Sequence, residues 1–88
     1  MTWENVSFVL GSKLSKKILE CLDSSEKPLA PSQIASLTNI ARSNVSTKLL
    51  QLRKRGLAVP VNPDMRKWRF YRITDEGKGV LREIREMK

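Results

Sequence analysis

The sequence lacks histidine altogether and contains one cysteine, Cys21. A lone cysteine cannot form an internal disulfide, and without histidine the usual sets of zinc ligands cannot be assembled. No apolar run approaches the roughly 20 residues that cross a bilayer. Trp3 and Glu4 stand where a signal peptide would need a basic stretch followed by an apolar one. We therefore expect a cytoplasmic protein with no metal and no cofactor.

Acidic residues are also scarce, because the 88 residues include nine acids against seventeen lysines and arginines, which gives a net charge of +8. Acidic residues are scarcest at residues 42–72, where nine basic residues accompany one acid, Asp64. This segment therefore carries the whole positive net charge of the chain. Charge that served only solubility would be spread along the chain. The segment therefore predicts a surface that binds a polyanion, either nucleic acid or an anionic membrane.

The length permits one small hydrophobic core, so we expect residues 1–88 to form a single domain. Helical spacing is clearest at residues 13–23, which follow a good N-cap, Ser12. The apolar residues that set this spacing are Leu14, Ile18, Cys21 and Leu22. A further helix is predicted upstream, where helical spacing joins Trp3, Val6 and Val9.

Two more helices are predicted close together, with a tight turn between them. Pro31 suits the first turn of a helix over residues 31–37. Asn39 tolerates the left-handed conformation that ends one helix and turns the chain sharply, and a longer helix over residues 42–55 ends at Gly56. The side chains expected to face the core are Ile34, Ala35 and Leu37 in the first helix and Val45, Leu49 and Leu52 in the second.

The rest of the chain predicts a β-hairpin and a closing helix. Residues 57–61 and 68–73 are the expected strands, joined by turn chemistry at residues 62–64. Thr74 is a good N-cap for a final helix, whose apolar stripe is Val80, Leu81, Ile84 and Met87. The expected fold is α+β and mostly helical: a winged helix-turn-helix with a three-helix core, a two-stranded β-hairpin wing over residues 58–73 and a C-terminal helix.

The helix over residues 42–55 has a polar and basic outer face, which fits the major groove of double-stranded DNA. Base edges are read by short side chains together with Asn, Arg or Lys near the helix N-terminus. The residues that supply this set are Arg42, Ser43, Asn44, Thr47 and Lys48. Contacts with the DNA backbone are expected from Ser46, Gln51, Arg53, Lys54, Lys67 and Arg69. The alternative is a solvated face whose basic C-terminal end is stabilised by the helix dipole.

In this order of elements the chain resembles the winged-helix regulators of the MarR and ArsR kind and their archaeal relatives. The residues that carry the resemblance are Ile34-Ala35, Ser43-Asn44-Val45-Ser46, Leu49 and Leu52 with Arg55-Gly56-Leu57, Asp64-Met65-Arg66, and Ile73-Thr74-Asp75-Glu76-Gly77. The resemblance implies a transcriptional regulator that binds DNA sequence-specifically and is not an enzyme. It also implies that Asp64 in the wing orients Arg66 toward the minor groove, where arginine suits a narrow groove.

The chain departs from the family's pattern in three ways. Ala41 stands where the family commonly has a Ser or Thr cap, and Asn39 replaces the usual glycine. The chain is also shorter than MarR-type proteins, so their mode of dimerisation cannot be carried over. A domain this small makes limited contact with DNA, and we expect a homodimer on two half-sites. Its predicted contacts are the remaining apolar residues, Trp3, Val6 and Val9 at one end and Val80, Ile84 and Met87 at the other.

Other functions are compatible with the same fold. A winged helix can serve as a protein-interaction adaptor within a transcription or other assembly. The charge at residues 42–72 favours DNA, because an adaptor does not need it, and with a helix-turn-helix in place no membrane partner is expected. RNA binding is a weaker alternative. Catalysis has no support, since Ser43, Ser46 and Thr47 have no histidine or organised acid nearby in the sequence. Cys21 is expected to be a small buried residue, and no small-molecule ligand can be identified.

Overall fold

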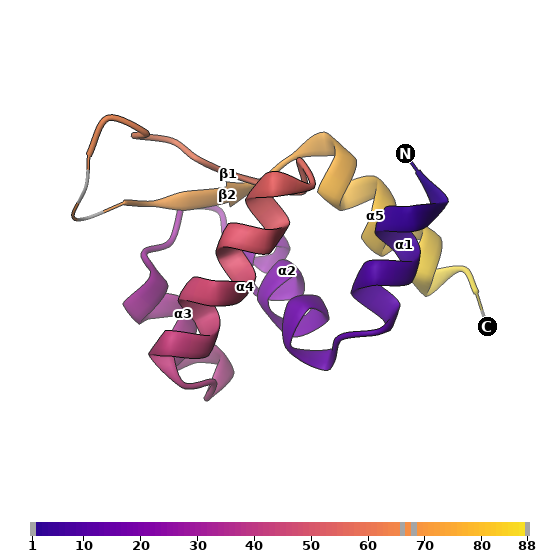
Figure 1. The fold of residues 1–88 in the computed structure, drawn as a ribbon, viewed down its shortest axis with the longest axis horizontal. Coiled ribbons are helices and arrows are strands. Elements are labelled where there is room, and N and C mark those ends of the chain that lie inside the picture. The colour runs from indigo at the N-terminus through magenta and orange to yellow at the C-terminus, as the bar shows by residue number, and fades with distance from the viewer. Residues whose placement is uncertain (1, 66, 68, 88) are drawn as a thin grey trace.

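The computed structural model describes residues 2–65, 67 and 69–87. Arg66 and Trp68, which the sequence places in the wing, lie outside the described residues. The elements are α1 (Trp3–Leu10), α2 (Lys13–Ser24), α3 (Pro31–Thr38), α4 (Arg42–Lys54), β1 (Ala58–Pro60), β2 (Tyr71–Ile73) and α5 (Asp75–Arg85). In Figure 1, α1 and α5 lie together at one end with both chain termini, and α3, α4 and the hairpin extend toward the other.

Side-chain caps begin several helices where the sequence predicts them. The Ser12 hydroxyl oxygen accepts a hydrogen bond from the Ser15 N–H at 3.2 Å, and α2 starts at the next residue, Lys13. The Thr74 hydroxyl oxygen accepts from the Gly77 N–H at 3.0 Å at the start of α5. Each cap satisfies a backbone donor that has no partner within its helix. The predicted helices over residues 13–23 and after Thr74 are confirmed.

The tight turns also depend on the predicted residues. Asn39 ends α3 with φ of 59°, in the left-handed region, and α4 begins three residues later. Gly56 has φ of 75° and follows α4, which ends at Lys54 with Arg55 as its cap. Residues with a side chain rarely adopt this left-handed backbone conformation, and Gly and Asn tolerate it best. The two residues set the lengths of α3 and α4 and the direction in which the chain leaves each helix.

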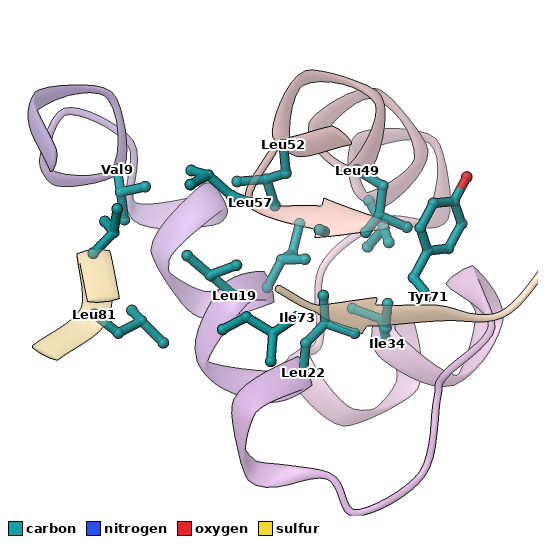
Figure 2. Packing of buried hydrophobic residues seen from close by; sticks show 14 of the residues in the cluster. Val9, Leu19, Leu22, Ile34, Leu49, Leu52, Leu57, Tyr71, Ile73 and Leu81 are labelled. Carbon is teal, nitrogen blue, oxygen red and sulfur yellow. The ribbon is translucent and has the colours of Figure 1, made fainter. Parts of the chain in front are cut away.

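The core is one cluster in which α2 is central, because this helix packs against α1, α3, α4, α5 and β2. Figure 2 shows Leu19 and Leu22 of α2 facing Ile34, Leu49 and Leu52. Tyr71 lies at the edge of this cluster, with its hydroxyl directed away from it. The expectation that Leu37 faces inward is wrong, because its side chain is 68% exposed. In the two-turn α3 only Ile34 is fully buried, and Leu37 lies over the outer side of α2.

The helices at the two ends of the sequence bury each other's apolar stripes. Val6 and Val9 of α1 and Val80 of α5 are fully buried, and Ile84 is 9% exposed. These four residues were predicted to contact a second copy, and that prediction is wrong because α1 packs against α5 within the chain. Periodicity identifies an apolar face but not the surface that covers it. Trp3, Leu10 and Met87 stay exposed at this end.

The hairpin is shorter than predicted but has a third extended residue beside it. Ala58 pairs with Ile73 and Pro60 with Tyr71 in an antiparallel register. Leu29 and Tyr71 exchange backbone hydrogen bonds of 2.9 and 2.8 Å, which ties the loop before α3 to the wing. Beyond Pro60, the Val61 N–H donates to the Phe70 carbonyl at 2.8 Å. The wing therefore projects from a base that is fixed to the core.

Candidate nucleic-acid interface

The outer face of α4 is exposed where the sequence predicts base contacts. Arg42, Ser43, Asn44 and Thr47 are exposed and Lys48 is half-buried, while Val45, Leu49 and Leu52 are buried on the opposite side. The Thr47 hydroxyl donates a hydrogen bond to the Ser43 carbonyl at 3.0 Å. α4 contains no acidic residue, so its outer face carries only neutral and positive side chains. Such a face can meet base edges without repelling phosphates.

α4 begins without a side-chain cap. Ala41, which stands where the family commonly has a Ser or Thr cap, precedes it and makes no side-chain hydrogen bond to the first turn. Backbone N–H groups at a helix start attract anions, since they lack partners within the helix and point along a favourable dipole. The first turn of α4 therefore presents its N–H groups together with the Arg42 guanidinium.

Basic side chains from the wing and α4 meet in a cleft beside the start of α3. Arg42 lines this cleft with Lys67 and Arg69 of the wing and with Pro31 and Ser32 of α3. Lys67 is exposed, and Arg69 is half-buried with its Nε donating to the Met65 carbonyl at 2.6 Å. This bond fixes the Arg69 side chain against the wing, and no acid lines the cleft among the described residues. Three basic side chains therefore share one concave surface beside the start of α3.

The remaining residues that were expected to contact the DNA backbone lie on different sides of α4. Ser46, Arg53 and Lys54 are exposed. Gln51 is half-buried, and its Oε1 atom is shielded from solvent, on the side where α4 approaches Phe8 of α1. Of the predicted wing pair, Asp64 is exposed, while Arg66 lies outside the described residues. The structure thus gathers Arg42, Lys67 and Arg69 and separates Gln51 from them.

Arg55 joins the two ends of the molecule. Its guanidinium lies 4.1 Å from the centre of the Phe8 ring, and its Nη1 atom donates to Asn5 Oδ1 at 3.4 Å. The Asn5 amide in turn donates to the Arg55 carbonyl at 3.3 Å. Sequence alone does not distinguish Arg55 from its neighbours Arg53 and Lys54, because its contact is with Phe8, 47 positions earlier in the chain.

Two residues of the Ile73-Thr74-Asp75-Glu76-Gly77 run, Thr74 and Gly77, have structural roles behind the interface. Besides capping α5, Thr74 donates its hydroxyl hydrogen to the Gly56 carbonyl at 2.7 Å. A Cβ atom at Gly77 would lie 2.7 Å from Ile73 Cγ1 and closer still to the Leu57 carbonyl oxygen. Glycine is therefore required where the first turn of α5 lies against Leu57 and Ile73. These contacts position the recognition helix relative to the rest of the core.

Several other features of the described residues bear on function. No helix among them is long and apolar enough to cross a membrane. No three metal-ligating side chains gather in the described part of the chain. Burial raises the pKa of the half-buried Cys21 thiol, which lowers the fraction of reactive thiolate.

Comparison with known families identifies this arrangement. The sequence model of the IclR helix-turn-helix domain matches residues 17–61, which run from α2 through β1. The chain belongs to the IclR helix-turn-helix family. The matched segment includes α3 and α4, so the helix-turn-helix that the sequence predicts is confirmed. No curated protein matches the chain.

Solved structures place this IclR-type domain among winged-helix regulators. The PcaV transcriptional regulator from Streptomyces coelicolor, solved with its natural ligand, is 26% identical over 81% of this chain and 50% of its own, with a TM-score of 0.71. A MarR family regulator from Silicibacter pomeroyi is 27% identical over 93% of this chain and 55% of its own, with a TM-score of 0.72. Another MarR family regulator shares the fold at 20% identity over 93% of this chain and 54% of its own, with a TM-score of 0.76.

The predicted winged helix-turn-helix fold and its MarR likeness are confirmed by these matches. The chain spans about half the length of the solved regulators that it resembles.

Proposed function

We propose that this IclR-type domain binds double-stranded DNA sequence-specifically, as the DNA-reading unit of a transcriptional regulator. In this proposal α4 enters the major groove, where Arg42, Ser43, Asn44, Thr47 and Lys48 read base edges. Arg53, Lys54, Lys67 and Arg69 contact phosphates, with Ser46 as a further polar contact. Asp64 and Arg66 act at the minor groove. The proposal involves no enzymatic activity.

The observation that supports it is the position of the positive charge. The exposed face of α4 and the cleft of Arg42, Lys67 and Arg69 adjoin each other, and both belong to the segment that holds the whole net charge. DNA offers phosphates on either side of a groove that admits one helix. A protein-interaction adaptor would leave this charge without a purpose.

Residues 1–88 are proposed to fold as one cytoplasmic domain that acts as a homodimer. The dimer would place two α4 helices on half-sites about one helical turn apart. Because Val6, Val9, Val80 and Ile84 are buried within the chain, the exposed residues at the α1–α5 end are the surface left for this contact. An archaeal origin and the absence of a small-molecule effector stay predictions from the sequence.

Fluorescence anisotropy of labelled random-sequence duplexes, measured between about 50 and 200 mM salt, tests the proposal. The wild type is expected to bind with an affinity that falls steeply with salt. An Arg53→Ala/Lys54→Ala variant should reduce the slope of log affinity against log salt by about 2, since two phosphate contacts are lost. The matched control is Arg82→Ala/Lys78→Ala on α5, which removes the same charge away from α4 and should leave the slope nearly unchanged.

Base reading is tested with a site selected by the wild type from a random duplex library. Asn44→Ala should lower affinity for the selected site by roughly tenfold while leaving binding to random duplexes almost unaltered, as expected for a side chain that contacts bases. Failure of the wild type to bind any duplex at low salt would contradict the proposal. That result would favour the adaptor function.

A further inference from the structure

One apolar side chain interrupts the polar face of α4. Leu50 is 50% exposed and is not part of the buried cluster. It follows Ser43 and Thr47 at helical spacing, and Lys54 continues the same stripe one turn later. This stripe lies on the side of α4 opposite to Val45, Leu49 and Leu52. Leu50 therefore lies on the face of α4 that is proposed to enter the DNA groove, about one turn after the base-reading residue Thr47.

Thr47 extends the apolar character of this position. Its hydroxyl hydrogen is committed to the Ser43 carbonyl at 3.0 Å, so the side chain retains a methyl group and an acceptor oxygen but no free donor. Thr47 and Leu50 are therefore adjacent positions on the outer stripe where contact with a ligand is partly or wholly apolar. Ser43 and Lys54, on either side of them, supply polar groups.

The surroundings of Leu50 decide which partner fits. Arg53 and Lys54 are exposed beside it, and α4 carries no acid. The major groove presents one apolar group, the C5 methyl of thymine, and it lies between phosphates that would satisfy the neighbouring cations. An apolar protein partner would have to bury the Arg53 and Lys54 charges without that compensation.

We propose that Leu50, with the methyl group of Thr47 beside it, determines specificity by contacting the C5 methyl of a thymine in the major groove. The inference rests on the proposed function, because it assigns a base preference to the helix that reads DNA. Single exposed leucines are common on protein surfaces. A second exposed leucine therefore serves as the control: Leu37 of α3 is 68% exposed and lies off the α4 face.

The test compares thymine with uracil, which lacks only the C5 methyl. A site is selected by the wild type from a random duplex library, each thymine is replaced in turn by deoxyuridine, and affinities are measured by fluorescence anisotropy. At one thymine in each half-site, the replacement should weaken wild-type binding by about fourfold, the loss expected for one buried methyl group. Leu50→Ala should bind the thymine and uracil duplexes equally, whereas Leu50→Met and the Leu37→Ala control should retain the difference.

The possible outcomes separate this inference from the proposed function. A wild type that binds its selected site and is indifferent to every uracil replacement overturns the inference and leaves DNA binding standing. Discrimination that persists undiminished in Leu50→Ala overturns the assignment to Leu50. A wild type that binds no DNA overturns the proposed function, and the inference with it. Circular dichroism of each variant verifies that the substitutions at exposed positions leave the fold intact.

Discussion

The two ends of the molecule share one core but have opposite surfaces. Residues 42–72, which form α4 and the wing, carry the whole net charge of +8, and the rest of the chain is electrically balanced. Outside the basic segment, Arg85 lies 3.3 Å from Asp23 across α5 and α2. Unpaired like charges destabilise a compact state through repulsion. Charge that is balanced at one end and left unbalanced at the other is therefore placed for a ligand and not for stability.

Outside the charged segment, the packing of α5 predicts that glycine substitutions on this helix change stability according to the space around each glycine. Gly77→Ala should lower the free energy of unfolding by about 2 kcal/mol, because the added Cβ collides with the Leu57 carbonyl and the Ile73 side chain. Gly79→Ala, on the same helix with open space around it, should raise stability by up to about 1 kcal/mol. Urea denaturation measures both, and equal effects of the two substitutions would contradict the packing described for α5.

At the charged end, a substitution of Asp64 distinguishes an effect of net charge on DNA binding from an effect of side-chain orientation. Asp64→Asn makes the segment more positive, yet it should weaken DNA binding by about fivefold, because the resemblance to MarR-type wings assigns Asp64 the role of orienting Arg66. Asp75→Asn, which removes an acid from α5, should have little effect on affinity. Tighter binding by Asp64→Asn in anisotropy titrations would mean that charge alone governs the wing.

The link between the two ends can be measured directly. In a double-mutant cycle of Arg55→Ala and Phe8→Ala, we expect a coupling energy of about 0.5–1 kcal/mol in the free energy of unfolding, the range of an exposed cation–π contact. A parallel cycle with Arg53→Ala, which is exposed and two residues before Arg55, should show no coupling to Phe8. Equal coupling in the two cycles would contradict the specific contact between Arg55 and α1.

The smallest expected effect concerns the uncapped start of α4. Ala41→Ser supplies a side-chain oxygen for the first-turn N–H groups and should raise stability by about 0.5–1 kcal/mol. Ser12→Ala removes the corresponding cap from α2 and should lower stability by a similar amount, about 1 kcal/mol. Thermal unfolding measures the expected gain and the expected loss of stability. No gain from Ala41→Ser would indicate that the N–H groups of the first turn of α4 already have hydrogen-bond partners.

Local chemistry made most of the fold predictable. Ser12, Asn39, Gly56 and Thr74 act through their own backbone and nearest neighbours, so the sequence was sufficient to place the turns and caps. The boundaries of the strands were less predictable, since the alternating pattern does not determine where backbone pairing stops. The wing was expected over residues 58–73, whereas its paired strands are three residues each.

Long-range packing was not predictable from periodicity. The apolar stripes of α1 and α5 are predicted to contact another chain, because the sequence does not show that these two helices pack against each other. In the structure Val9 and Val80 are both buried by this packing. At the candidate site, the exposed residues of α4 followed from its period, but the cleft of Arg42, Lys67 and Arg69 depends on the tertiary position of the wing. Periodicity assigns no role to Leu50, because it lies off the apolar stripe of α4.

The most direct test of the central claim is a titration of ¹⁵N-labelled protein with duplex DNA, followed by amide chemical shifts. The account predicts that the shifts that change fall in α4 and the wing and that the amides of α1 and α5 are nearly unaffected. Changes concentrated in α1 and α5, or no change at low salt, would contradict the assignment of the charged end as the DNA interface.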